Sequence, residues 1–317
     1  MSFLILIVGF FFLIKGADIF VEGAASIAKK FNVPSMIIGL TIVAMGTSAP
    51  EAAVSITSSL AGQNDMSVAN VVGSNFFNIL MVLGVSSLIA KLPVEKNTIK
   101  KDAPFLIIVS AILLLFGVDL KISRIEGIIL LSLFTYFLIN TIKSAKASSK
   151  NSSIDEIATT AIEDEVVSEI PMLKTLLLCI IGIIGIVIGG DMVVNSATSI
   201  ATSFGMSANL VGLTIVAVGT SLPEFVTSIV AIKKGETEIA IGNVIGSNLF
   251  NILLVLGLAT TIYPITISMF ALIDIAFMVA ITVLLYLFMK KDSSLVKKHG
   301  LILVIIYVAY MIYTILR

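Results

Sequence analysis

Apolar residues fill this chain in long runs that short polar stretches interrupt. The runs are long enough to cross a bilayer as helices, each of which needs roughly 20 residues. They do not alternate apolar and polar positions, as the strands of a membrane β-barrel would. We therefore predict an all-α membrane protein. Ten transmembrane helices are expected, at residues 3–27, 34–60, 67–90, 104–118, 124–142, 172–198, 207–232, 239–262, 269–289 and 300–316.

One long polar stretch divides these segments into two sets of five. Residues 143–171 read KSAKASSKNSSIDEIATTAIEDEVVSEIP, which is rich in Ser and Thr and then acidic. Such a composition is typical of a connector. We expect an N-terminal half at 1–143, a connector at 144–171 and a C-terminal half at 172–317.

Basic residues lie almost entirely on one side of the predicted membrane. Loops after odd-numbered segments hold 16 Lys and Arg, whereas the loops after even-numbered segments and the C-terminus hold 3. Basic loops are retained in the cytoplasm. We expect a plasma-membrane protein with both termini outside and the connector inside.

Composition adds little beyond this picture. The chain is 58% apolar and 13% charged, about half the charge of a soluble domain, and its formal net charge of zero gives no indication of nucleic-acid binding. The single cysteine, Cys179, cannot form an internal disulfide. The only histidine, His299, follows two lysines and is expected to be a solvated loop residue.

An internal repeat relates the two halves. The sequence GLTIVAMGTSAPEAAVSI at 39–56 matches GLTIVAVGTSLPEFVTSI at 212–229 in 13 of 18 positions, and residues 69–84 match 242–257 in 12 of 16. Both matches have the same offset of 173 residues. Because five is odd, the second half enters the membrane in the opposite sense. This predicts two inverted five-helix repeats, as in secondary transporters, with the repeated blocks meeting near the midplane.

The first repeated block places Glu51 and Glu224 directly after a proline, inside an apolar segment. Proline removes a helix hydrogen-bond donor, and the nearby glycine lowers helix propensity further. We expect a broken helix with freed carbonyls around Ala44–Thr47 and Ala217–Thr220. A plain proline kink is the structural alternative. Ionisable residues inside a membrane mark functional sites by default.

The second block, G-N-V-[VI]-G-S-N-x-F-N, adds neutral oxygens. Asn70, Ser74 and Asn78 are spaced by four and share one helix face. Gly73 and Gly246 are expected to let another helix approach closely. Interhelical hydrogen bonding by these side chains is the structural alternative to ion binding.

Together the blocks predict a cation site built from oxygen alone. Such a cage suits a hard cation such as Ca²⁺, and its two carboxylates could equally be neutralised by Na⁺ or protons. Competition for one ligand set is the physical basis of exchange. The charges of Asp18, Glu22 and Asp191 are expected near a membrane face, and Asp274 has no assigned role. Candidate oxygens belong to Glu51, Glu224, Thr47, Thr220, Ser48, Ser221, Ser74, Ser247, Asn78 and Asn251, with the carbonyls of Ala44 and Ala217.

With these motifs the chain resembles the cation/calcium exchanger superfamily, and within it the prokaryotic sodium/calcium exchangers. The resemblance covers the whole ten-segment plan. It implies an antiporter that exchanges Na⁺ for Ca²⁺ by alternating access, without a cofactor, as segments one and six slide across the rest. It implies Glu51 and Glu224 as Ca²⁺ ligands, with the backbone oxygens of Thr47 and Thr220. It implies sodium sites built from those glutamates, Ser48, Ser221, Ser74, Ser247, Asn78 and the carbonyls of Ala44 and Ala217.

Other transport modes remain as alternatives. Buried carboxylates can bind protons, so H⁺/Ca²⁺ antiport on the same fold is the first of them. Retention of Ser and Asn in both halves favours sodium, and Asn251 stands where potassium-dependent relatives carry Asp, which argues against K⁺ co-transport. The connector is too short for the calcium-sensing domains of animal relatives.

Two further classes fit the sequence less well. A cation channel would usually need a symmetric oligomer, whereas here the symmetry lies within one chain, consistent with a monomer. No histidine or nucleophile–base set accompanies the glutamates, so we do not expect an enzyme.

Overall fold

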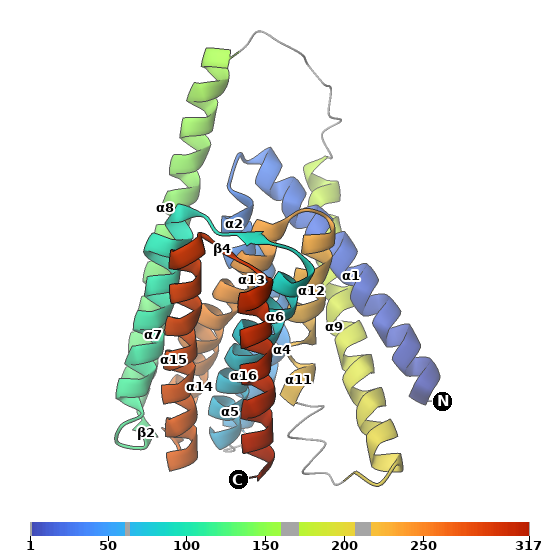
Figure 1. The fold of residues 1–317 in the computed structure, drawn as a ribbon, viewed down its shortest axis with the longest axis vertical. Coiled ribbons are helices and arrows are strands. Elements are labelled where there is room, and N and C mark those ends of the chain that lie inside the picture. Colours follow the sequence, from blue (N-terminus) through green and yellow to red (C-terminus); the bar gives the residue numbers. More distant parts are fainter. Residues whose placement is uncertain (1, 61–63, 160–170, 207–216, 317) are drawn as a thin grey trace.

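The computed structural model describes residues 2–60, 64–159, 171–206 and 217–316, and these are almost entirely helical (Figure 1). Within them, seven helices are long and apolar enough to cross a membrane, or eight if the bent pair Ser35–Thr47 and Ala49–Leu60 is one span. The chain is an all-helical multi-pass membrane protein. The count of ten is not established by these residues: the segment expected at 104–118 is a helix of 14 residues, and the one at 207–232 begins outside the described range.

Helices follow one another with short connections. The first part of the chain contains α1 (Ser2–Lys30), α2 (Ser35–Ile38), α3 (Ala44–Thr47), α4 (Ala49–Leu60), α5 (Asn64–Phe76), α6 (Leu83–Ile89), α7 (Ala103–Phe116) and α8 (Arg124–Thr159). The second part contains α9 (Met172–Ser203), α11 (Ala217–Gly219), α12 (Leu222–Lys233), α13 (Thr237–Phe250), α14 (Gly257–Ile262), α15 (Met269–Asp292) and α16 (Lys297–Leu316). In the described ranges, four π-helical turns join some of them: η1 (Gly39–Val43), η2 (Phe77–Val82), η3 (Thr98–Asp102) and η5 (Asn251–Leu256).

The expected connector is only partly described. Helix α8 continues to Thr159, well past the expected boundary at residue 143, while residues 160–170 lie outside the described range.

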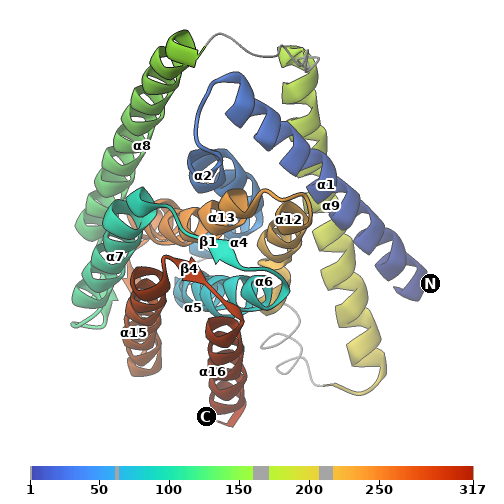
Figure 2. The ribbon, with the colours of Figure 1, turned by 45° about the horizontal axis from the view of Figure 1, so that its top comes forward.

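Helices α1 and α9 cross closely at one side of the bundle (Figures 1 and 2). Glycines allow this approach. A Cβ on Gly16 would lie 2.6 Å from the backbone nitrogen of Ile186, and one on Gly182 would lie 2.7 Å from the Cα of Phe20. Small residues at a helix interface let backbones pack directly against each other in lipid.

Helix α13 lies at the centre of the bundle, with every residue from Ile239 to Phe250 buried. The close approach expected at Gly246 is confirmed, because a Cβ there would lie 2.5 Å from the carbonyl oxygen of Leu40. At Gly73 no described residue lies within 4 Å of such a Cβ, so the same expectation stays a prediction there. By the 173-residue offset, the neighbour equivalent to Leu40 would be residue 213, which is not among the described residues.

Two small antiparallel sheets join segments that are far apart in the sequence. Strand β1 (Leu92–Pro93) pairs with β4 (Ser294–Leu295), and β2 (Lys121–Ile122) pairs with β3 (Ile265–Thr266). At the offset of 173 residues, β1 corresponds to β3 and β2 to β4. Strand β1 therefore pairs with the counterpart of β2, and β2 pairs with the counterpart of β1. The two pairings are reciprocal.

His299 is not the solvated loop residue expected from the sequence. It lies in the first turn of α16, is 3% exposed, and stacks on Phe288 with ring centroids 4.3 Å apart. Its Nε2 lies 3.2 Å from a carboxylate oxygen of Asp292. The short chain between α15 and α16 turns back on itself, which packs the end of one helix against the start of the next and buries the imidazole.

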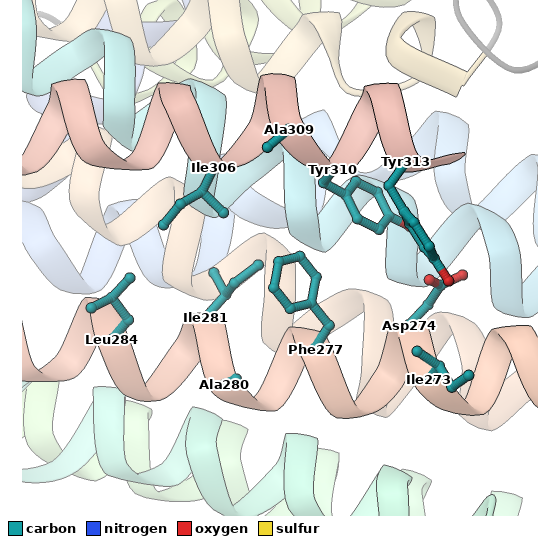
Figure 3. A pocket seen from close by; sticks show the side chains of 10 residues that line it. All are labelled: Ile273, Asp274, Phe277, Ala280, Ile281, Leu284, Ile306, Ala309, Tyr310 and Tyr313. Carbon is teal, nitrogen blue, oxygen red and sulfur yellow. The ribbon is translucent and has the colours of Figure 1, made fainter. Parts of the chain in front are cut away.

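An apolar groove of about 510 Å³ runs between α15 and α16 (Figure 3). Phe277, Ile281 and Ile306 line its length. Asp274, which is 8% exposed, lies at one end with Tyr310 and Tyr313, and its carboxylate lies at the hydroxyl end of Tyr313 (Figure 3).

Candidate cation-binding site

Two helix breaks position the two glutamates. The first pair of helices bends by 48° at Ser48, whose φ and ψ are −83° and 8°, and the second break falls at Thr220 and Ser221, where Ser221 has nearly the same angles. Glu51 and Glu224 each lie in the first turn of the helix that follows. Helix N-termini carry partial positive charge, which stabilises a carboxylate there. The broken helix predicted from the proline is therefore confirmed.

The carbonyls at the first break are less free than the sequence suggests. The Ala44 carbonyl accepts the backbone N–H of Ser48 at 3.0 Å. Helix α3 keeps its geometry up to Thr47, because the proline removes only the donor that would have reached Gly46. At the second break, the Ser221 N–H donates to the Val218 carbonyl at 3.2 Å.

Each glutamate is held by a serine from the opposite half. Ser48 Oγ donates to Glu224 Oε1 at 2.9 Å, and Ser221 Oγ donates to Glu51 Oε1 at 3.1 Å. Both carboxyl groups are fully buried. The two broken helices thus face each other and exchange their polar contacts, as the inverted arrangement predicts.

The companion helices add a second serine to each carboxylate. Ser74 on α5 donates to Glu51 Oε1 at 3.4 Å, and Ser247 on α13 donates to Glu224 Oε1 at 3.3 Å. Two serine hydroxyls therefore donate to Oε1 of each glutamate, and neither of them donates to Oε2.

Four buried oxygens at the centre accept no hydrogen bond from any described residue: Oε2 of Glu51, Oε2 of Glu224, Oδ1 of Asn78 and Oδ1 of Asn251. Buried polar groups are otherwise nearly always paired, and an unpaired carboxylate oxygen is especially costly. All four atoms are acceptors only, and they come from equivalent positions in the two repeats. This arrangement suits a desolvated cation.

An amide network fixes the two asparagine oxygens. Asn78 Nδ2 donates to Asn248 Oδ1 at 3.1 Å, and Asn251 Nδ2 donates to Asn75 Oδ1 at 3.2 Å. Because each amide nitrogen is used in this way, the Oδ1 atoms of Asn78 and Asn251 are left available.

A further asparagine pair supports the glutamate helices from behind. Asn243 Nδ2 donates to Ser228 Oγ at 3.1 Å, and its Oδ1 accepts the Thr47 hydroxyl at 3.0 Å. Asn70 Nδ2 donates in the equivalent way to Ser55 Oγ at 2.9 Å. The Thr47 hydroxyl is therefore a helix-positioning group here, and its backbone carbonyl is the part of Thr47 that remains for an ion.

The structure brings most of the expected residues together. Thr47, both serine pairs, both glutamates, Asn78 and Asn251 are buried around one centre, and Thr220 is half-buried. Ala217 lies in the short helix α11. Asp18 and Glu22 lie elsewhere, in ion pairs with Lys234 at 2.8 and 3.8 Å. Among the described residues, no group of three or more His, Cys, Asp or Glu could hold a metal, so neutral oxygens must complete any coordination shell.

Sequence reasoning missed three asparagines that orient the site: Asn75, Asn243 and Asn248. The sequence did carry a signal for them, because all three fall inside the second repeated block. The 173-residue offset also relates Asn75 to Asn248 and Asn70 to Asn243.

Comparison with known proteins agrees with this geometry. The model of the sodium/calcium exchanger protein family matches residues 1–143 and 174–316. The sodium/calcium exchanger MaX1 of Methanosarcina acetivorans is 32% identical, with 98% of this chain and 97% of that protein aligned. The putative antiporter CaxA of Alkalimonas amylolytica is 43% identical over 81% of this chain and 80% of its own length.

Solved structures extend the match to three dimensions. The sodium-calcium exchanger NCX_Mj, in crystals soaked with Na⁺ and Sr²⁺, aligns with a TM-score of 0.83 at 32% identity, covering 98% of both chains. These relatives are transporters and not enzymes. The chain accordingly belongs to the sodium/calcium exchanger family and is a multi-pass cation/Ca²⁺ antiporter.

Proposed function

We propose that this protein exchanges Na⁺ for Ca²⁺ across the membrane by alternating access. The observation that carries the proposal is the set of four acceptor-only oxygens on Glu51, Glu224, Asn78 and Asn251, buried without donors. They supply the charge and the ligand type that a hard cation needs.

The charge of the site sets the exchange. Two carboxylates balance one Ca²⁺, and the same two charges can be balanced by Na⁺ ions bound at subsets of the oxygens. In this proposal Ca²⁺ is held by the two glutamates and the backbone oxygens of Thr47 and Thr220. The sodium ions use the glutamates, Ser48, Ser221, Ser74, Ser247, Asn78, Asn251 and the carbonyls of Ala44 and Ala217. Binding one kind of ion excludes the other because they share ligands.

The architecture that supports this function is two inverted five-helix halves, 1–143 and 172–317, separated by the connector 144–171. The reciprocal strand pairs and the crossed serine–glutamate bonds at one offset support this division. In this scheme α1 and α9 move together against the remaining helices, because their glycine contacts leave no space for independent sliding.

The position of lysines supports an orientation with both termini outside and the connector in the cytoplasm of a plasma-membrane protein. Both halves of the site lie in one chain, so a monomer is the proposed transport unit.

The test is radioactive calcium uptake into proteoliposomes loaded with Na⁺ and diluted into Na⁺-free buffer at equal pH. Uptake should require the sodium gradient. The variants Glu51→Gln and Glu224→Gln should each lose at least roughly a hundredfold in uptake, because removing one of two buried charges costs about 3 kcal/mol or more.

A matched control is Asp119→Asn, which makes the same carboxylate-to-amide change in an exposed turn and should transport normally. Uptake driven by a pH gradient without sodium would make the protein an H⁺/Ca²⁺ antiporter. Calcium flux without any counter-ion gradient would make it a channel.

A further inference from the structure

A second cavity, of about 520 Å³, lies away from the cation site. It is formed by the start of α2, the chain before α7, and the facing sides of α7 and α8. These segments carry lysines from the loops that the sequence places in the cytoplasm, so the cavity lies where the helices leave the membrane.

One part of the cavity is apolar and aromatic. Leu40, Phe105 and Phe137 line it, and the rings of Phe105 and Phe137 are stacked with centroids 5.9 Å apart. Tyr136 adds a third ring, 6.2 Å from that of Phe105. Such a wall suits an acyl chain.

The other part is charged, with both signs present. Lys101, in the turn before α7, and Lys143, on α8, are exposed lysines, and Glu95 and Asp102 are partly buried carboxylates in the same lining. Within the described part of the chain, no ion pair within 4 Å joins any two of these four. Burial raises the pKa of Asp102 to about 6, and burial with the neighbouring Glu238 raises that of Glu95. Neither carboxylate thus has an ion pair within 4 Å among the described residues, although Lys101 is near enough to Asp102 to lower its pKa.

The cavity has a counterpart in the second half of the chain. At the 173-residue offset, Lys101, Phe137 and Asn140 correspond to Asp274, Tyr310 and Tyr313, which line the groove of Figure 3. The two halves thus share the hydrophobic groove but not its charges. The charged groups, rather than the fold, must decide which headgroup each groove accepts.

We propose that the cavity between α7 and α8 binds one phospholipid whose headgroup carries both a phosphate and a primary ammonium, with an acyl chain along the aromatic wall. Lys101 and Lys143 would pair with the phosphate, and Glu95 and Asp102 would accept the ammonium N–H groups. A choline headgroup cannot donate such hydrogen bonds. An anionic headgroup without an amine would face two carboxylates.

The test is thermal unfolding of the delipidated protein in detergent, titrated with phosphatidylethanolamine, phosphatidylcholine or phosphatidylglycerol of identical chains. A ligand that binds only the folded state raises Tm. Phosphatidylethanolamine should raise it by about 2–4 °C more than the other two lipids. Native mass spectrometry should show one retained molecule.

Charge variants locate the effect. Two double variants should each remove the preference for phosphatidylethanolamine. One combines Lys101→Gln with Lys143→Gln, and the other combines Glu95→Gln with Asp102→Asn. Lys121→Gln, an exposed lysine in β2, should keep it. Equal shifts with all three lipids, a larger shift with phosphatidylglycerol, or a preference that survives both double variants would overturn the proposal. None of these readouts depends on transport, so the outcome is separate from that of the exchange assay.

Discussion

The buried glutamates use their two oxygens differently. In each, Oε1 accepts serine hydroxyls from both halves, while Oε2 accepts none. A serine hydroxyl has one donor and two lone pairs. The same serine can therefore donate to an empty carboxylate and, after rotating, offer an oxygen to an ion. The polar groups of the site can therefore be satisfied both when it is empty and when an ion is bound.

The crossed serines can be tested separately from the glutamates. Ser48→Ala and Ser221→Ala should each raise the Na⁺ concentration for half-maximal exchange about fivefold, because one neutral ligand is worth about 1 kcal/mol. Calcium uptake against a series of sodium concentrations measures this.

Ser110→Ala is the control for these serines. Ser110 is equally buried, but its hydroxyl donates to the Leu106 carbonyl within α7, away from the site. An unchanged sodium dependence in both site variants would remove the serines from the ion shell.

Which oxygens are free could not be deduced from the sequence. The repeats identified the glutamates and serines, because intramembrane polar residues at one offset are rare. The spacing of four selected Asn78, but it did not show that Asn75 accepts the Asn251 amide and leaves the Asn251 oxygen free of donors. The π-helical turn η2 begins at Phe77, between the two asparagines, and changes the angular relation that an ideal helix would give.

Helix contacts explain the pairing of α1 with α9. The glycines of α1 and α9 can be read from the sequence. Which of them face the other helix depends on the angle and position at which the two helices cross. Gly189 and Gly190 are adjacent in α9 and have opposite surroundings. A Cβ on Gly189 would lie against the backbone nitrogen of Leu13, whereas the one described atom within 4 Å of a Cβ on Gly190 belongs to Pro223, at 3.8 Å.

The change Gly189→Ala should therefore force α1 and α9 apart, lower Tm by several degrees and reduce exchange. Gly190→Ala should keep the free energy of unfolding within about 1 kcal/mol of the original value, because alanine has the better helix propensity. Exchange by this variant should be unchanged. Thermal unfolding of the two variants in one detergent makes the comparison. Equal effects at both positions would show that the glycine contact does not hold the pair.

Helix breaks were predictable because proline acts locally. The 48° bend at Ser48 follows from the Pro50 position. The extension of α8 to Thr159 was not, since the residues after 143 are polar and have no apolar stripe to mark a helix. The burial of His299 also escaped prediction, because it depends on the way α15 and α16 meet.

The complete chain is held together by contacts between its two parts. Strands β1 and β2 pair only across the halves, and each glutamate finds its nearest serine there. Co-expression of residues 1–170 and 171–317 as separate polypeptides should therefore give a complex that copurifies and exchanges calcium.

Each polypeptide alone should be inactive in the same uptake assay, because its glutamate would lack the opposite serine. Failure of the two to copurify would show that the covalent link is needed for assembly. Uptake by either one alone would contradict the crossed site.

The reciprocal strand pairing has a consequence for the origin of such a chain. Since each half completes the other with equivalent atoms, a single five-helix ancestor inserted in both orientations could form the same site as a two-fold homodimer. Gene fusion then frees the halves from sequence identity wherever the crossed contacts do not reach. Lys101 and Asp274 occupy one such pair of positions and have diverged to opposite charge, while the glutamates and their serines have stayed the same.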